Sequence, residues 1–181
     1  MRRKLVTAVI ILLLGTSVGL FAAEKKSSTV PWLVSVDSPG TIDLTITAGY
    51  TWWGLGLNAG VEFTIGQFNL GAVPLSWGIT AQGSAGFDAA GTGIALAGLP
   101  TLNVGFDFGK NLKFEAFLGL GLGFVVETWG VGGSGIGIAE YGGATWWFFN
   151  NIGLTLEDGY VYSPGWGNSW YFFGIGFTLK I

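Results

Sequence analysis

The sequence predicts an all-β fold, a transmembrane antiparallel up-and-down β-barrel of eight strands. Half of the 181 residues are hydrophobic, only 10% are charged and the mean hydropathy is +0.55, whereas about 25% of the residues in soluble domains are charged. Beyond the N-terminus, no apolar run approaches the ~20 residues that a membrane helix needs. Apolar residues instead alternate with small or polar ones, as in strands that present one side to lipid.

The first 23 residues have the features of an export signal. Met1–Lys4 is basic, Leu5–Leu14 is an apolar run, and Ala22-Ala23 offers small residues for cleavage. We therefore expect residues 1–23 to be a signal peptide, with the cleavage position defined only to within a residue. An uncleaved membrane anchor is the alternative. Removing the signal leaves five lysines against eleven acids and no arginine, which disfavours nucleic acid as a partner.

The rest of the chain divides into a lead-in, residues 24–40, and a predicted barrel, residues 41–181. The lead-in is polar and contains one candidate short strand, Trp32–Val36. The alternation then predicts strands at residues 41–52, 55–65, 75–88, 94–108, 112–127, 136–149, 152–162 and 171–181. Most are long enough to cross a bilayer at a tilt, since about 9–11 residues suffice.

The strand count has one alternative. Pro100 cannot donate a ladder hydrogen bond, so it indicates either a bulge or a turn that splits residues 94–108 into two short strands. If the strand splits and Trp32–Val36 also pairs, the barrel has ten strands. We favour eight, because the two halves of a split strand are too short to span a bilayer.

The phase of the alternation predicts which residues face the lumen. An eight-stranded lumen is only wide enough for side chains to fill, so the aliphatic face must be the outer one, which disfavours a soluble barrel with an apolar interior. Charges within strands should then point inward, because on the lipid face they are costly. The predicted lumen acids are Asp43, Glu62, Asp88, Asp107, Glu115, Glu127, Glu140 and Glu157, and the predicted lumen bases are Lys113 and Lys180. Asp158 breaks the rule, which indicates a bulge or a position above the bilayer.

Aromatic residues fall into two predicted groups. Those near strand ends form two girdles at the membrane interfaces, one with Trp52, Phe87, Phe124, Tyr160, Tyr162 and Tyr171 and the other with Trp77, Phe106, Phe108, Phe114, Trp147, Phe149 and Phe177. The second group faces the lumen beside its glycines and comprises Phe117, Trp146, Phe148, Trp170 and Phe172.

Residue types that carry chemistry are scarce. The chain has no cysteine and no histidine, which excludes disulfides, thiolate metal sites, the usual zinc ligand and every catalytic triad that contains histidine. The adjacent acids Glu157 and Asp158 point to opposite faces of a strand and do not form a carboxylate dyad. We expect no enzyme activity, no catalytic residue, no cofactor and no metal.

The barrel region resembles the small outer-membrane barrel proteins of OmpA/OmpX/OmpW-like architecture. The most specific piece is the last strand, in which Tyr171, Phe173, Ile175, Phe177, Leu179 and Ile181 alternate with small or polar residues. In that family such a strand is the recognition signal of the barrel-assembly machinery, although it commonly ends in phenylalanine rather than isoleucine. The resemblance implies a bacterial outer-membrane location, with membrane lipid and the assembly machinery as partners. It does not imply one activity.

Four functions are consistent with these features. The first is a structural barrel whose lumen acids and hydroxyls plug the interior. The second is a small passive pore, which would prefer small cations because its lumen is acidic. The third is an OmpW-like carrier of hydrophobic solutes, suggested by inward aromatic residues. The fourth is a surface adhesin or receptor, which normally needs longer loops than this chain offers. The sequence leaves the oligomeric state open.

Overall fold

The fold is described by a computed structural model covering residues 31–34, 37–51, 54–87, 91–109, 112–127, 133–163 and 169–181. The predicted signal peptide lies outside these residues, as do Trp52 and Asp88. No helix in the described ranges is long and apolar enough to cross a membrane.

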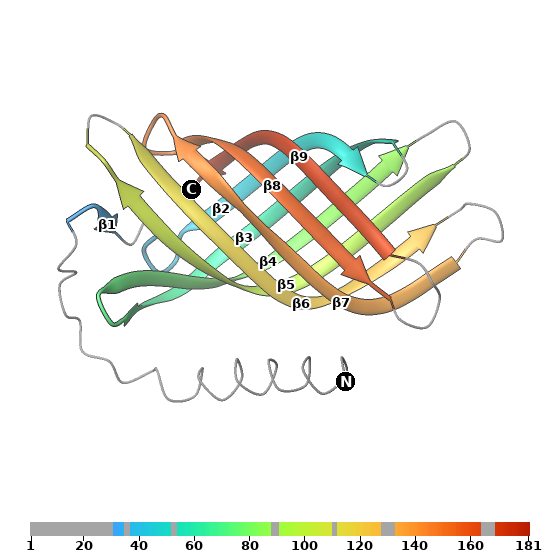
Figure 1. Cartoon of the computed structure of the whole chain (residues 1–181), viewed down its shortest axis with the longest axis horizontal. Helices are drawn as coiled ribbons and strands as arrows, with labels where there is room; N and C mark the ends of the chain where they lie inside the picture. Colours follow the sequence, from blue (N-terminus) through green and yellow to red (C-terminus); the bar gives the residue numbers. More distant parts are fainter. Residues whose placement is uncertain are drawn as a thin grey trace.

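Eight long antiparallel strands form a closed barrel (Figure 1), which confirms the predicted fold class. They are β2 (Ile42–Thr51), β3 (Gly54–Leu70), β4 (Val73–Phe87), β5 (Thr92–Asp107), β6 (Lys113–Glu127), β7 (Gly133–Trp147), β8 (Ile152–Tyr162) and β9 (Ser169–Lys180). Each strand pairs with the next along the chain, and β2 pairs with β9 to close the barrel. Just past the end of β9, Ile181 exchanges both backbone hydrogen bonds with Ile42, the first residue of β2, at 3.1 and 2.8 Å.

The barrel has eight long strands rather than ten, because the strand predicted at residues 94–108 does not split. β5 continues through Pro100, which lies opposite Ile79 of β4. Only the pairing of β5 with β6 is interrupted there, between Gly98 and Thr101. From the lead-in, a two-residue strand β1 (Leu33–Val34) pairs with the part of β5 that extends beyond β4.

The two ends of the barrel differ in their connections. At one end, which we call the turn end, lie the short turns β3–β4, β5–β6 and β7–β8, together with β1 and the C-terminus (Figure 1). Gly71 and Gly109 adopt positive φ angles in two of these turns, a conformation that glycine tolerates best. The opposite end, the loop end, carries the β2–β3, β4–β5, β6–β7 and β8–β9 connections.

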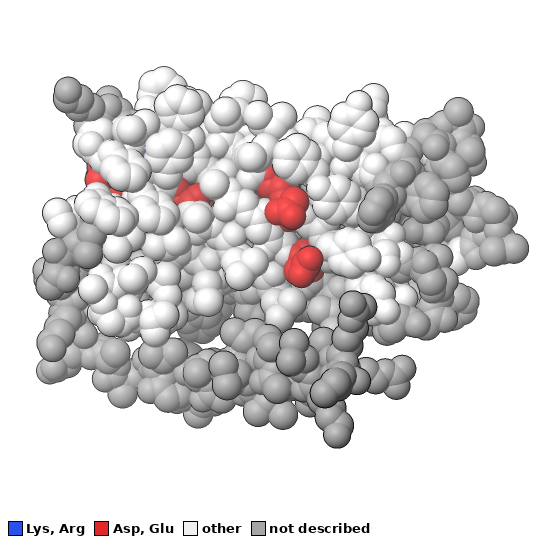
Figure 2. Space-filling view, viewed as in Figure 1, with Lys and Arg blue, Asp and Glu red and all other residues white. Residues whose placement is uncertain are grey.

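The strands bury polar side chains and expose apolar ones, the reverse of a soluble protein. Ile46 and Leu122 are 67% and 68% exposed, whereas the inward Thr155 is fully buried. The face visible in Figure 2 is accordingly almost free of charge, with a few isolated acidic patches. Such a surface matches the apolar band that barrels present to lipid.

The predicted phase of β7 is wrong. Glu140 is exposed on the outer face with Ile136 and Ile138, whereas Trp147, predicted to lie in a girdle, is buried inside at 4% exposure. Trp146 is 38% exposed, and Phe148 contacts it at 4.5 Å between ring centroids. The prediction put Glu140 inside because it was charged, but the two isoleucines set the phase of the strand.

Candidate functional site

Side chains fill the interior of the barrel in three regions. Toward the loop end, an apolar cluster is built around Trp170, whose indole Nε1 donates a hydrogen bond to Ser84 Oγ at 3.0 Å. The buried members of this cluster are Ala95, Leu99, Val125, Ala139, Tyr141, Val161 and Trp170. Tight packing here follows from inward glycines. A Cβ on Gly86 would lie only 2.8 Å from the indole of Trp170.

Glu157 is the centre of the middle region. It is 1% exposed and accepts hydrogen bonds from the Thr47 hydroxyl and the Asn58 amide at Oε1, and from the Tyr141 hydroxyl at Oε2. These donors come from β2, β3 and β7, so the carboxylate of β8 joins four strands. Three donors compensate much of the cost of burying the carboxylate.

Glu62 organises the opposite wall of the middle region. Its Oε1 accepts a hydrogen bond from Asn103 Nδ2 at 2.6 Å, and its Oε2 accepts one from Thr80 Oγ1 at 3.3 Å. Thr80 and Thr101 are also hydrogen-bonded to each other, at 3.2 Å. The wall between β7 and β2 carries a chain of threonine hydroxyls, Thr145–Thr155, Thr155–Thr178 and Thr178–Thr45, at 2.9, 2.5 and 2.8 Å.

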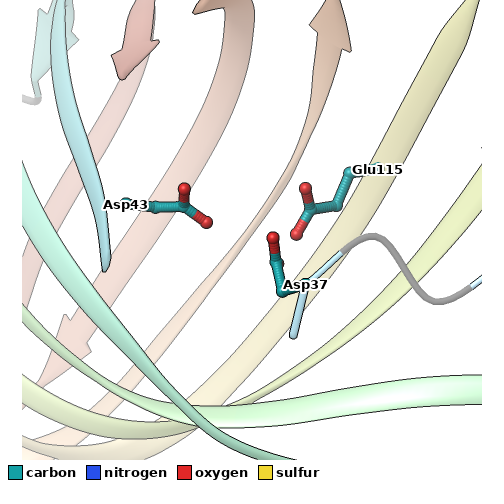
Figure 3. Close-up of side chains that lie close together, drawn as sticks. All are labelled: Asp37, Asp43 and Glu115. Carbon is teal, nitrogen blue, oxygen red and sulfur yellow. The ribbon is translucent and has the colours of Figure 1, made fainter. Parts of the chain in front are cut away.

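At the turn end, three buried carboxylates converge on one point. Asp37 reaches into the barrel from the lead-in, Asp43 is the second residue of β2, and Glu115 lies in β6 (Figure 3). One oxygen of each lies within 4.8 Å of the others. Lys180 forms ion pairs with Asp37 and, at 3.5 Å, with Glu115. We call these four side chains the turn-end cluster.

Neighbouring groups hold the turn-end cluster in place. The Trp147 indole Nε1 donates a hydrogen bond to Glu115 Oε2 at 3.0 Å, and Lys180 Nζ lies 4.0 Å above the centre of the Trp147 ring. Gln67 Nε2 donates to the backbone oxygen of Asp37 at 2.5 Å. Gly40 and Thr41 exchange backbone hydrogen bonds with Thr64 of β3, both at 2.9 Å. The end of the lead-in is therefore hydrogen-bonded to β3.

The cavities inside the barrel are small. One lies beside the turn-end cluster, has a volume of about 20 Å³, and is lined by Asp43, Glu62 and Glu115 with the hydroxyls of Thr45, Thr80 and Tyr141. A second cavity of about 20 Å³ lies nearer the loop end, beside Asn58, Ser84 and Trp170. Each has room for about one or two water molecules.

The structure brings some predicted lumen residues together and separates others. Asp43, Glu62, Glu115, Glu157 and Lys180 lie in the interior. Asp107 and Lys113 lie at the turn-end rim, partly exposed, and pair with each other at 3.7 Å. Glu140 lies on the outer face, as does Asp158, which needs no bulge to point outward. Asp88 and the side chain of Glu127 lie outside the described residues.

Besides Trp147, which was predicted to lie in a girdle, two important interior residues were not predicted. Tyr141 was missed because the phase of β7 was inverted, and the isoleucine phase of that strand would have found it. Asp37 was missed because it lies in the lead-in, where no alternation predicts direction. Only the path of the lead-in brings Asp37 into the turn end of the barrel.

Comparison with solved structures places this fold among the outer-membrane barrels. The outer membrane enzyme PagL superposes with a TM-score of 0.61 at 13% identity, covering 77% of this chain and 99% of PagL. The N-terminal β-barrel domain of Pseudomonas aeruginosa OprF superposes with a TM-score of 0.50 at 10% identity, covering 80% of this chain and all of that domain. No protein-family model and no curated protein matches the sequence. The likeness shows the architecture of small outer-membrane barrels, and it shows the fold alone.

Proposed function

We propose that this chain is an integral protein of the bacterial outer membrane with a structural role and a lumen closed by its own side chains. The observation that carries the proposal is the hydrogen bonding of Glu157, which ties β8 to Thr47, Asn58 and Tyr141 through the middle of the barrel. The apolar cluster around Trp170 lies on one side of this network and the turn-end cluster on the other. Solute would have to break the network to pass.

Single-channel recording tests the closed lumen against the small cation-preferring pore. Purified full-length protein in a planar bilayer, under a KCl gradient, should give no unitary conductance steps. A Thr47→Ala/Asn58→Ala/Glu157→Ala variant, which removes the central network, should admit ions more readily. The matched control is Asp158→Asn on the outer face, which should behave like the wild type. Reproducible wild-type steps with a cation-selective reversal potential would overturn the structural role in favour of the pore.

The proposed location rests on the apolar outer surface and on the last strand. Tyr171, Phe173 and Phe177 of β9 all lie on the outward face, in the pattern that serves as an assembly signal in the family that the sequence resembles. We expect lipid and the barrel-assembly machinery to be partners. After membrane fractionation, the protein should co-sediment with outer membrane and resist alkaline extraction. Recovery in the soluble or inner-membrane fraction would contradict the location.

We further propose that the barrel has no catalytic activity. The sequence has neither histidine nor cysteine, so its nucleophiles lack the usual general base. The similarity to an outer membrane enzyme is one of fold, at 13% identity, and fold does not fix function. Purified protein should not hydrolyse ester or phospholipid substrates above a heat-denatured control. Steady turnover by the folded protein would overturn this proposal.

A further inference from the structure

The turn-end cluster carries more negative charge than its lysine can balance. Asp37, Asp43 and Glu115 place one carboxylate oxygen each within 4.8 Å of the others (Figure 3). Lys180 is the one basic group among the described residues that forms an ion pair with them. All three acids are buried. Buried carboxylates in excess of their counter-charge are costly, because low-dielectric surroundings replace water.

A second observation points to a ligand at this position. Asp43 is 6% exposed, and its Oδ1 is fully enclosed without a hydrogen-bond partner among the described residues. Its carboxylate is turned toward Asp37 and Glu115 in Figure 3. The adjoining cavity of about 20 Å³ is lined by Asp43, Glu62 and Glu115, and these carboxylates and its size suit a small hydrated species. The residue whose buried carboxylate oxygen lacks a hydrogen-bond partner therefore lines the cavity.

We propose that the turn-end cluster binds one divalent cation, with Asp37, Asp43 and Glu115 as its carboxylate ligands. The ligand set favours Ca²⁺ over Mg²⁺, because Ca²⁺ takes about 6–8 oxygen ligands in a flexible geometry, whereas Mg²⁺ usually keeps several waters and is held by one or two carboxylates. The three carboxylate oxygens, all within 4.8 Å of one another, can reach one such ion. The nearby threonine and tyrosine hydroxyls that line the cavity can hold waters that complete the coordination shell.

Lys180 acts as a tethered competitor of the cation. Its ammonium contacts two of the three proposed ligands, Asp37 and Glu115, and a divalent ion at the cluster would repel it. The Lys180 side chain is 15% exposed and lies over the Trp147 ring. From this position the displaced ammonium can turn outward to the solvent at the turn end. The bound divalent ion therefore replaces the Lys180 ammonium as the counter-charge of the carboxylates. Removing that ammonium should tighten the binding of the ion.

Terbium luminescence reports binding directly on the full-length protein in detergent micelles. Tb³⁺ takes the oxygen ligands of Ca²⁺, and the indole of Trp147, which bonds to Glu115, can sensitise its emission. We expect sensitised emission from the wild type that Ca²⁺ displaces at lower concentration than Mg²⁺. Lys180→Met should lower the Tb³⁺ concentration for half-maximal emission by about tenfold, and Asp43→Asn should abolish the saturable signal.

Matched controls separate this site from acids elsewhere. Asp158→Asn and Glu140→Gln remove outer-face carboxylates and should leave the emission and its Ca²⁺ displacement unchanged. Thermal unfolding gives a second readout, in which Ca²⁺ should raise the midpoint of Lys180→Met more than that of the wild type. If Asp43→Asn does not fold, the Lys180→Met comparison still decides.

Either of two results would overturn the cation site. One is the absence of a Ca²⁺-dependent signal in both the wild type and Lys180→Met, which would mean that protons and Lys180 neutralise the cluster. The other is an equal loss of signal in Asp43→Asn and Asp158→Asn. Neither result bears on the closed lumen, because the conductance experiment depends on the Glu157 network rather than on the cation.

Discussion

Tyr141 on β7 donates its phenolic hydrogen to Glu157 Oε2 on the adjacent strand β8, and this bond joins two different parts of the interior. The ring of Tyr141 belongs to the apolar cluster and packs against Phe117, with 5.0 Å between ring centroids. Its hydroxyl belongs to the polar network that includes Thr47 and Asn58. The tyrosine therefore couples apolar packing near the loop end to hydrogen bonding in the middle of the barrel.

Replacing Glu157 should destabilise the barrel in proportion to the donors that it leaves unsatisfied. Glu157→Leu strands three buried donors, each costing about 1–3 kcal/mol, so the free energy of unfolding should fall by at least about 3 kcal/mol. Glu157→Gln keeps one acceptor oxygen and should cost less. Urea unfolding in lipid vesicles measures both values. Equal stability of Glu157→Leu and the wild type would contradict the central role of this residue.

Inward glycines make room for Trp170. A Cβ on Gly86 would lie 2.5 Å from Thr51 Oγ1 and 2.8 Å from Trp170 Cη2, so Gly86→Ala should overpack the core and lower stability by about 1–3 kcal/mol. Gly98→Ala is the matched control, because a Cβ at exposed Gly98 meets nothing within 4 Å. That variant should be neutral or slightly stabilising. Tryptophan fluorescence and urea unfolding should separate the two, and similar behaviour would argue against tight packing at Trp170.

The period-two alternation predicted the barrel because every strand that crosses a membrane must present apolar residues to lipid on one face. In β2 and β9, Ile46 and Phe177 face outward while Thr47 and Thr178 face inward, as their phase predicted. The pairing of β3 with β4 contains a bulge between Thr64 and Gly66. The inner residues of β3 that precede this bulge lie on the predicted face. Pro100 fits a long strand because it faces outward and only the pairing with β6 is interrupted.

The placement of the site was only partly predictable. Glu140 was assigned by its charge, and the phase set by Ile136 and Ile138 overrides that assignment. The meeting of Asp37 with Lys180 joins the lead-in to the last strand, and no local pattern encodes such a distant contact. Strand phase determines which residues can enter the lumen, whereas register and the path of the lead-in determine which of them meet.

The outer-face carboxylates of Glu140 and Asp158 should cost stability in a bilayer. Both are exposed on neighbouring strands whose other outward residues are largely apolar. Because an acid on the lipid face costs up to about 2 kcal/mol, Glu140→Leu and Asp158→Leu should each stabilise the barrel in vesicles. Glu140→Gln should give a smaller gain. Loss of stability in the leucine variants would indicate that these acids have a polar partner in the membrane.

Trp32 should hold the lead-in against the end of β5. Its ring stacks on Phe106 and Phe108 at 6.0 and 6.2 Å, and its backbone oxygen accepts a hydrogen bond from the Asp107 amide at 2.9 Å. Trp32→Ala removes two aromatic contacts of about 0.5–1.5 kcal/mol each, so local opening should speed hydrogen exchange at the Asp107 amide by about tenfold. The Phe108 amide, which bonds to Leu112 at 3.0 Å instead, is the internal control and should keep its protection. Faster exchange at both amides would mean that the whole end of β5 has loosened. Unchanged exchange at the Asp107 amide would mean that the backbone hydrogen bond holds the lead-in without the Trp32 ring.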